Sequence, residues 1–208
     1  KKCHGTGCSI YKETGDCVMP KEGIFCRVIV PGVLRPGDYL EYQPRVIRIM
    51  IITVSDRASR GEYEDLSGPL LEKLATEFFT SGGRQVTATV RVVPDDEHLI
   101  RSLTKEGIEA GNDIIFTSGG TGIGPRDVTP EAIRPLIEKE IPGIMELIRV
   151  KYGMQIPNAL ISRGIAGLSG TSLIYTLPGS PRAIKEYTDE IFGTLEHSLR
   201  MIHGIDLH

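Results

Sequence analysis

Residues Arg45 to Ser55, RVIRIMIITVS, form a nearly continuous run of apolar and β-branched side chains. Strands that are buried on both faces of a parallel sheet have this composition, whereas a half-exposed strand alternates apolar and polar residues. A parallel partner strand is reached by a crossover connection, which is usually a helix. The run therefore predicts a mostly parallel sheet with helices covering both of its faces.

The chain beyond this strand has the alternation of strands and helices that such a sheet requires. Strand patterns occur in QVTATVRVVP, DIIFTSG and GTSLIYTLPG, and helical patterns in SGPLLEKLATEFF, DDEHLIRSLTKEGIEAG, TPEAIRPLIEKE and SPRAIKEYTDEIFGTLEHSLRMIH. We expect Asp95 or Asp96 to cap the second of these helices and Gly111 to end it. We expect Thr129 to cap the third, with Pro130 at its first position. The predicted fold class is α/β, a three-layer sandwich with a mostly parallel sheet.

The first 44 residues predict a small β-rich N-terminal segment instead. We expect a strand from Gly23 to Val30, a turn at Pro31-Gly32, a second turn at RPGD, and a short strand around Tyr39 to Tyr42. Two or three short strands cannot bury a core by themselves. We therefore divide the chain into 1–44 and 45–208, and interpret the first part as the end of a larger β domain or as an arm that packs on another surface.

All the cysteines lie in that first part, at Cys3, Cys8, Cys17 and Cys26. Their gaps do not match the paired C-x-x-C spacing of zinc sites. Free structural thiols are the favoured interpretation, and a metal or disulfide site is the alternative. A reactive thiol is a third possibility, with Cys8 as the candidate because its glycine-rich setting could leave it exposed.

The overall composition excludes several classes of function. Hydrophobic residues make up 40% of the chain, charged residues 25%, and the formal net charge is −3. This balance predicts a packed globular protein without a nucleic-acid surface. The longest apolar runs fall well short of the roughly 20 residues of a membrane span. We see no secretion leader at Lys1, although the chain does not begin with Met, and we expect a cytoplasmic protein without a membrane partner.

Ligands of open parallel sheets bind in the crevice beyond the carboxyl ends of the strands. Four segments of this chain follow strand ends: TVSDRAS, VVPDDE, TSGGTGIGPRD and TLPGSPR. All four contain serine, aspartate or glycine where an apolar strand stops. We therefore expect a binding site built from these four loops.

The third loop has glycines at 119, 120, 122 and 124. Glycines let backbone N–H groups approach a ligand closely, and nests of such donors bind anions such as phosphate. We expect the helix near Thr129 to add its positive end, while the alternative is a tight turn without a ligand. A P-loop is excluded because Pro125 and Arg126 follow Gly124, and the same proline breaks a dinucleotide fingerprint.

Carboxylates lie next to this anion-binding loop. Asp127 follows it, and Asp95 and Asp96 close the preceding strand. A carboxylate would repel a phosphate unless a cation lay between them, so these residues predict a Mg²⁺ ion that bridges to phosphate oxygens. The alternatives are a salt bridge from Asp127 to Arg126, and helix capping by any of the three.

Serines at two other strand ends have two possible uses. Hydroxyl and carboxylate groups at these positions contact a ligand, or they cap the helices that follow. The residues are Ser55, Asp56 and Ser59 in SDRAS, and Ser180 in LPGSP. The histidines are scattered without metal-ligand spacing. Arg149 and Lys151 more simply belong to a solvated helix face.

In these loops, the chain from about Arg45 to His203 resembles the molybdopterin adenylyltransferase family, which includes the gephyrin G domain. The blocks that carry the resemblance are TVSDRAS, VVPDDE, SGGTGIGPRDVTPEA, EIPGIMELIR, ISRGIAGL and LIYTLPGSP, in the family's order. The resemblance implies transfer of AMP from Mg-ATP to the terminal phosphate of molybdopterin, with release of pyrophosphate. It also implies a homotrimer and delivery of the product to a molybdate-insertion protein.

The resemblance also implies roles for particular residues. The two catalytic, metal-binding aspartates of the family correspond to Asp95 and Asp127. The pterin-phosphate loop corresponds to Gly119, Gly120, Thr121 and Gly122. Further substrate contacts correspond to Ser55, Asp56, Ser118 and Ser180.

The front of the chain departs from that family. The stretch from Cys3 to Asp38 resembles the C-terminal part of a MOSC domain, a β-rich module linked to sulfur transfer on the molybdenum cofactor. Only about 40 residues of such a domain are present, which is too short for the activity. Cys8 lies in a motif that resembles a MOSC cysteine region.

Two other functions compete with adenylyl transfer. One is a non-catalytic molybdopterin-binding or scaffold protein, against which the presence of both Asp95 and Asp127 argues. The other is the later step of molybdate insertion, which would require a molybdate pocket and usually extra domains that this sequence does not show.

Overall fold

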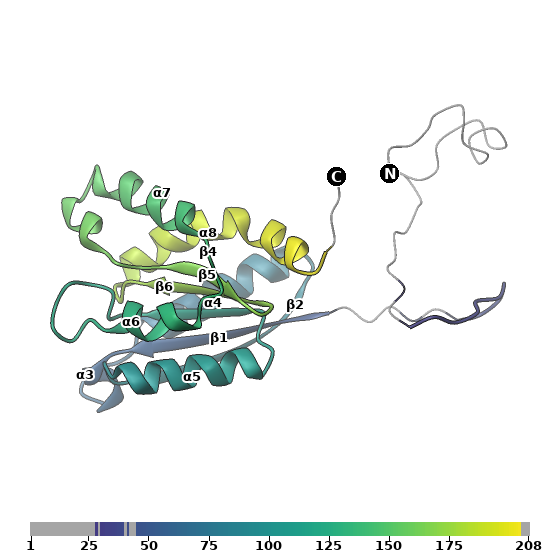
Figure 1. Cartoon of the computed structure of the whole chain (residues 1–208), viewed down its shortest axis with the longest axis horizontal. Coiled ribbons are helices and arrows are strands. Elements are labelled where there is room, and N and C mark those ends of the chain that lie inside the picture. Colours follow the sequence, from purple (N-terminus) through teal and green to yellow (C-terminus); the bar gives the residue numbers. More distant parts are fainter. Residues whose placement is uncertain (1–27, 29, 40, 42–44, 205–208) are drawn as a thin grey trace. The chain divides into compact units, whose positions relative to one another are not determined.

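A computed structural model of the chain describes residues 28, 30–39, 41 and 45–204. The chain forms two compact units, and the larger runs from Pro44 to Asp206. The described residues up to Glu41 belong to the other unit. The larger unit contains all the helices and strands of the described residues (Figure 1).

The larger unit is built on one six-stranded sheet with the order β2-β1-β3-β6-β5-β4. The first four of these strands are parallel to one another, while β5 and β4 are antiparallel to their neighbours. The strands span Val46–Val54 (β1), Gln85–Val93 (β2), Ile114–Ser118 (β3), Lys139–Glu140 (β4), Ala166–Ser169 (β5) and Ser172–Leu177 (β6). The prediction of a mostly parallel sheet is confirmed.

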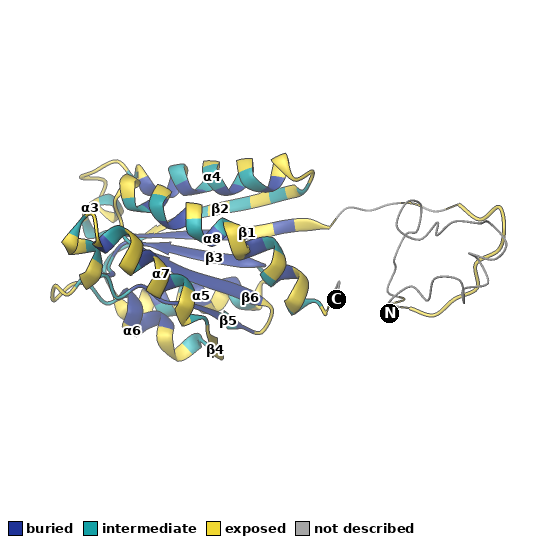
Figure 2. Ribbon diagram, turned by 90° about the horizontal axis from the view of Figure 1, so that it is seen from above, coloured by how far each residue is buried: buried dark blue, intermediate teal, exposed yellow. Residues whose placement is uncertain are grey.

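Helices cover both faces of the sheet (Figure 1). One core lies between the sheet and α4, α7 and α8, and a second lies between the sheet and α5 and α6. Figure 2 shows the buried strands between the outer layers of helices. The α-helices span Asp56–Ser59 (α3), Ser67–Ser81 (α4), Glu97–Glu109 (α5), Thr129–Ile133 (α6), Pro142–Gly153 (α7) and Pro181–Ile202 (α8), and 3-10 turns span Arg134–Leu136 and Pro157–Ile161. The three-layer α/β prediction is therefore confirmed, and no helix of the described residues is long and apolar enough to cross a membrane.

The expected cap of α5 is resolved in favour of Asp96. Its side chain accepts a hydrogen bond from the backbone N–H of Leu99 at 2.9 Å, while Asp95 makes no capping bond. Gly111 follows the helix with φ +73°, a left-handed conformation that suits glycine after a helix end.

Two expectations for the third helix are wrong. The helix has only five residues, because Pro135 lacks an N–H group and its ring opposes helical continuation. Thr129 is the first helical residue and not its cap, since its hydroxyl donates to the backbone oxygen of Gly119 at 2.8 Å. The strict alternation of strand and helix ends later, at β5, because β5 and β6 form an antiparallel hairpin without a helix between them.

The other unit confirms one predicted turn. In RPGD, the backbone N–H of Asp38 donates to Arg35 O at 3.1 Å, and the Asp38 carboxylate accepts from the Arg35 N–H at 2.7 Å. Val28, Val30, Tyr39 and Glu41 are not part of a strand, so the strands expected at Gly23–Val30 and Tyr39–Tyr42 are not found at the described positions. The rest of those two strands, and all four cysteines, lie outside the described residues.

Candidate active site

The carboxyl ends of the four parallel strands are bonded to one another. Gly119, directly after β3, donates its N–H to Leu177 O of β6 at 2.9 Å. Its φ is +110°, and a Cβ there would lie 2.2 Å from Val54 O at the end of β1. The N–H of Ser55 donates to Val93 O of β2 at 2.8 Å. The four predicted loops therefore start at one edge of the sheet, and only glycine fits at position 119.

The glycine loop, residues 119–127, has backbone donors without a protein acceptor. Its peptide oxygens at 119 and 120 accept bonds from Thr129, and those at 121 and 122 accept bonds from Arg163. Because carbonyl and N–H point in opposite directions within a trans peptide unit, these bonds turn four N–H groups away from Thr129 and Arg163. Those N–H groups belong to residues 120–123, and none takes part in a hydrogen bond among the described residues. Such a run of unpaired donors can bind an anion.

Two cavities meet at this loop. The first has a volume of about 470 Å³, and its walls include Gly120, Thr121, Gly122, Asp127 and Ser180. The second has a volume of about 380 Å³ and lies on the side of β1 and α4; its walls include Ser55, Thr53, Ser118 and Gly119. Both cavities are lined by Gly120, Gly179 and Ser180. The site therefore has room for two ligands that share a boundary.

Asp56 and Asp95 bind each other's backbone. The N–H of Asp56 donates to Asp95 Oδ2 at 2.9 Å, and the N–H of Asp95 donates to Asp56 Oδ1 at 3.2 Å. Arg126 forms an ion pair with Asp56 Oδ2 at 2.5 Å. A Cβ on Gly120 would lie 3.4 Å from Asp95 Oδ1. Asp95 thus lies beside the glycine loop with Oδ1 outside this pairing, whereas both oxygens of Asp56 are engaged.

Asp127 folds back onto its own loop. Its Oδ2 accepts a hydrogen bond from the N–H of Gly124 at 2.8 Å, and a Cβ on Gly122 would lie only 2.7 Å from the same oxygen. The alternative of a salt bridge to Arg126 is not found, since that arginine pairs with Asp56. The glycine at 122 therefore allows the Asp127 carboxylate to lie over the loop, beside the first cavity.

The predicted serines are partly occupied by helix capping. Ser55 caps α3 by accepting the N–H of Ala58, and Ser180 caps α8 by accepting the N–H of Ala183, each at 3.2 Å. A capping hydroxyl still has its hydrogen to donate, and both serines line a cavity. Ser118 is fully buried below the loop. Capping and ligand contact are therefore compatible at Ser55 and Ser180.

Arg163 is a site residue that the sequence reasoning missed. Its N–H donates to Thr121 O at 2.9 Å, its Nε to Gly122 O at 2.6 Å, and its guanidinium also to Asp127 O at 2.5 Å. Its other terminal nitrogen forms an ion pair with Glu131. Its only signal in the sequence was its place in the block ISRGIAGL, which assigned it no role.

The Arg163–Glu131 pair affects the ionisation of the carboxyl group. Partial burial acts to raise the pKa of Glu131, but the hydrogen bond from Arg163, a backbone hydrogen bond and the charges of Arg163 and Arg134 together outweigh it. The pKa of Glu131 is therefore held below its ordinary value, so the ion pair is present at neutral pH.

Ser162 and Tyr187 form a further part of the first cavity's wall that was not predicted. The Tyr187 hydroxyl donates to Ser162 Oγ at 2.9 Å. Burial raises the pKa of Tyr187, so the phenol stays protonated and donates this bond. The Ser162 hydroxyl keeps its own hydrogen for another acceptor.

The carboxylates fit a magnesium ion that also binds phosphate oxygens. No group of three or more His, Cys, Asp or Glu side chains that could hold a metal occurs among the described residues. Mg²⁺ needs no such group when substrate phosphates and water complete its octahedron, since one or two carboxylates then suffice. Asp95 and Asp127 each have one oxygen that is not used in hydrogen bonds within the described chain. These two residues could therefore hold Mg²⁺ together with a phosphorylated ligand.

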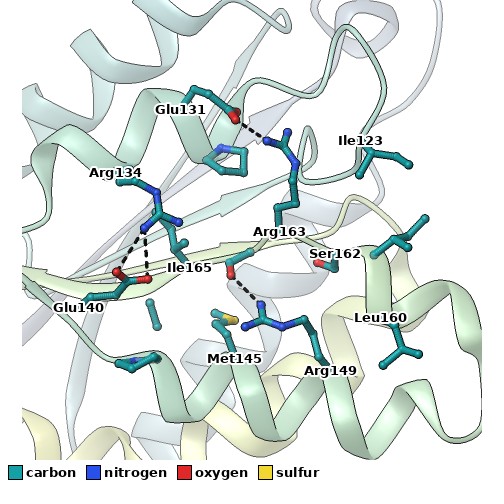
Figure 3. Close-up of a pocket in the computed structure, with 15 residues that line it drawn as sticks. Ile123, Glu131, Arg134, Glu140, Met145, Arg149, Leu160, Ser162, Arg163 and Ile165 are labelled. Atoms are coloured by element: carbon teal, nitrogen blue, oxygen red, sulfur yellow. Dashed lines mark hydrogen bonds and ion pairs between the residues drawn. The ribbon is translucent and has the colours of Figure 1, made fainter.

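A larger cavity, of about 540 Å³, has Arg163 in its wall (Figure 3). Its wall carries the Arg163–Glu131 pair, the Arg134–Glu140 pair, and Arg149, which donates to Gly164 O at 3.1 Å. None of the residues predicted as site residues lines it. The largest of the three cavities therefore lacks the predicted site residues, but it shares Ile161 and Ser162 with the first cavity.

Together, the fold and the site define an α/β protein that is suited to bind anionic ligands beyond the carboxyl ends of its strands. The sequence profile of a family described as "Probable molybdopterin binding domain" matches residues 50–197. The chain belongs to this family.

Relatives and solved structures agree with this assignment. The molybdopterin adenylyltransferase of Helicobacter pylori (strain J99) is 37% identical over 161 residues, which cover 77% of this chain and 90% of that protein. The molybdopterin adenylyltransferase of Escherichia coli K12 is 36% identical over 76% of this chain and 80% of its own length. The crystal structure of the molybdopterin biosynthesis enzyme MoaB from Thermus thermophilus has a TM-score of 0.68 and 38% identity, covering 76% of this chain and 97% of that one.

Proposed function

We propose that this protein transfers the adenylyl group of Mg-ATP to the terminal phosphate of molybdopterin. The products are adenylyl-molybdopterin and pyrophosphate, so the protein acts as a nucleotidyltransferase in molybdenum cofactor biosynthesis. The proposal draws on the names of the relatives and on one observation in particular. That observation is the row of four unpaired N–H groups, at residues 120–123, beside half-paired carboxylates and between two cavities.

The pterin phosphate is assigned to the glycine loop. The loop's free N–H groups provide donors for phosphate oxygens, and Ser180 adds a hydroxyl from the neighbouring strand end. Thr121 and Gly122 of the loop line the first cavity and not the second, which favours the first cavity for the pterin. The nucleotide is assigned to the second cavity, where the buried Thr53 hydroxyl has no partner among the described residues.

The reaction is a substitution at the α-phosphorus of ATP. An oxygen of the molybdopterin phosphate forms the new P–O bond, and the bond to the bridging oxygen of pyrophosphate breaks. The chain's own contribution is to hold the two phosphates at the shared boundary of the cavities, near Gly120 and Ser180. Magnesium held by Asp95 and Asp127 would neutralise the phosphate charges.

A scaffold protein that binds molybdopterin without turnover is the alternative. The half-paired oxygens of Asp95 and Asp127 argue against it, because phosphate binding alone would be weakened by two carboxylates beside the loop. Molybdate insertion has no observation in its favour here.

A pyrophosphate-release assay tests the proposal. The full chain is incubated with molybdopterin, ATP and Mg²⁺, and pyrophosphate is measured with and without the pterin. We expect release that requires all three components. Binding of molybdopterin without any release would support the scaffold function instead.

We further propose that the protein is a cytoplasmic homotrimer that hands its product to a molybdate-insertion protein. Exposed apolar side chains on α7, at its C-cap and on the 3-10 turn after it provide surface for subunit contact: Leu147, Val150, Met154, Leu160 and Ile161. Light scattering should give about three times the chain mass of 22.8 kDa. A monomer at micromolar concentration would contradict the trimer.

The MOSC-like character of residues 1–44 also stays a prediction, since most of the residues that carry it lie outside the described part of the chain.

A further inference from the structure

Arg163 forms hydrogen bonds to two parts of the site, the glycine loop at Gly122 and the backbone of Asp127. It comes from the segment between the Pro157–Ile161 turn and β5, far in sequence from the glycine loop. Its guanidinium reaches Gly122 O, in the phosphate-binding part of the loop, and Asp127 O, in the residue with the half-paired carboxylate. One planar group therefore fixes the distance between a phosphate donor and a metal-binding residue.

The bond to Gly122 O sets the direction of a free donor. The peptide unit between residues 122 and 123 is planar, so holding its oxygen on Arg163 points the N–H of Ile123 the opposite way. The bond from the backbone N–H of Arg163 to Thr121 O does the same for the N–H of Gly122. Half of the four free donors are thus oriented by one residue.

Glu131 holds the guanidinium in turn. Figure 3 shows Arg163 directed towards Glu131, with Ile123 at the tip of the loop nearby. The ion pair uses the terminal nitrogen that does not bind Asp127 O. The three side-chain contacts therefore use all three guanidinium nitrogens, and a lysine ammonium could not reproduce that fork.

We propose that Arg163 is a positioning residue for the reaction: its guanidinium sets the phosphate-binding face of the glycine loop and the place of Asp127 together. That the glycine loop binds phosphate and Asp127 binds metal rests on the proposed function. That Arg163 links the positions of the loop and Asp127 rests on the hydrogen bonds alone. Arg163 itself does not line the first or the second cavity, so it acts through the loop and not by touching substrate.

The test replaces Arg163 by Met and by Lys in the full chain. Arg163→Met keeps much of the side chain's volume and the backbone bond to Thr121 O but removes the fork. We expect kcat/KM for molybdopterin to fall about 100-fold, as for a misplacement on the order of 1 Å in a reacting group. We also expect the Mg²⁺ concentration for half-maximal rate to rise, because Asp127 is displaced. Arg163→Lys should give an intermediate loss in both quantities.

Arg149→Met is the matched control. Arg149 lies on the wall of the same larger cavity and donates to a single carbonyl, Gly164 O, without touching the glycine loop (Figure 3). We expect it to keep the Mg²⁺ dependence of the unsubstituted protein. Thermal unfolding of all variants distinguishes an unfolded variant from a folded one in which the loop and Asp127 are displaced. If Arg163→Met does not fold, Arg163→Lys provides the test.

Binding of molybdopterin, measured by fluorescence titration without ATP, separates this proposal from the proposed function. If the unsubstituted protein releases no pyrophosphate, the proposed adenylyl transfer is wrong. In that case, weaker molybdopterin binding by Arg163→Met than by Arg149→Met still supports the positioning role. If Arg163→Met binds molybdopterin and responds to Mg²⁺ as Arg149→Met does, the positioning role is wrong.

Discussion

The two ends of the sheet both carry aspartates, but their pairing differs. At the amino ends, Asp113 is 3% exposed; its Oδ2 accepts the N–H of Arg48 at 2.9 Å, and its Oδ1 pairs with Arg45. At the carboxyl ends, Asp95 and Asp127 each engage one oxygen and leave the other out of the bonding within the described chain. A fully paired carboxylate stabilises the fold, whereas a half-paired one is available to a ligand.

The backbone shows the same contrast. At the amino ends, Asp113 donates its N–H to Arg48 O and accepts the N–H of Leu173, each at 2.9 Å. At the carboxyl ends, the oxygens of residues 119–122 are bonded while the N–H groups of residues 120–123 are not bonded within the described chain. The bonds of Asp113 therefore hold strands together, whereas the loop that follows the strand-joining bond of Gly119 leaves four N–H groups available to a ligand.

The largest expected effect is the loss of turnover in Asp127→Asn. The amide keeps the size of the side chain but removes the charge that would hold Mg²⁺. We expect adenylyl transfer to fall by at least about 100-fold, as when one charge-stabilising group is lost from an active site. The fold and most of the molybdopterin binding should remain. Turnover equal to that of the unsubstituted protein would remove Asp127 from the mechanism.

Asp113→Asn should give the opposite result. The substitution breaks the pair with Arg45 at a buried position and lowers the free energy of unfolding by about 2 kcal/mol, less than for a fully buried pair because Arg45 is half exposed. Turnover per folded molecule should not change. Urea unfolding and the pyrophosphate assay measure the two quantities; a stable but inactive variant would contradict the division between the two ends.

Ser180→Ala and Asp96→Ala form a smaller, matched comparison. Both residues cap helices, at α8 and α5, and each substitution should cost about 1 kcal/mol of stability. Only Ser180 lines the cavities, so only Ser180→Ala should also raise the KM for molybdopterin. An equal rise of KM in Asp96→Ala would mean that the loss of helix capping, and not the loss of a contact with molybdopterin, explains the KM of both variants.

Glu131→Gln gives the smallest effect, and it depends on pH. The pKa of Glu131 is lowered in the folded protein, so its stabilising contribution is complete above the ordinary glutamate pKa of about 4.3 and is lost as the pH falls through the lowered folded value. The pair is about half exposed, so we expect a difference of at most about 1 kcal/mol at pH 7. That difference should vanish well below pH 4; a constant difference from pH 7 to pH 3 would show that Glu131 acts by packing and not by charge.

The strands that carry the site were predictable because β-branched and other apolar residues are dense in them, as a continuous run in β1 and in alternation with polar residues in β2. The run from Arg45 to Ser55 gave β1, and the same reasoning gave β2, β3 and β6. The loops followed, since parallel strands place their carboxyl ends at one edge. The hairpin of β5 was missed because Ala166–Ser169 is short and flanked by glycines, which resembles a loop.

The contacts within the site were not predictable in the same way. Arg163 binds carbonyl oxygens 36 to 41 residues away, and any residue could supply such oxygens, so no spacing in the sequence reveals them. The pairing of Asp56 with Asp95 likewise depends on how β1 and β2 end next to each other. Capping by Asp96 and not Asp95 was left open because the sequence gives no difference between adjacent aspartates.

A crystal structure with Mn²⁺ and a non-hydrolysable ATP analogue tests the central claim most directly, since Mn²⁺ replaces Mg²⁺ and is located by its anomalous scattering. We predict one peak in contact with carboxylate oxygens of Asp95 and Asp127 and with the nucleotide phosphates, next to the glycine loop. A bound nucleotide whose metal touches neither carboxylate would contradict the account.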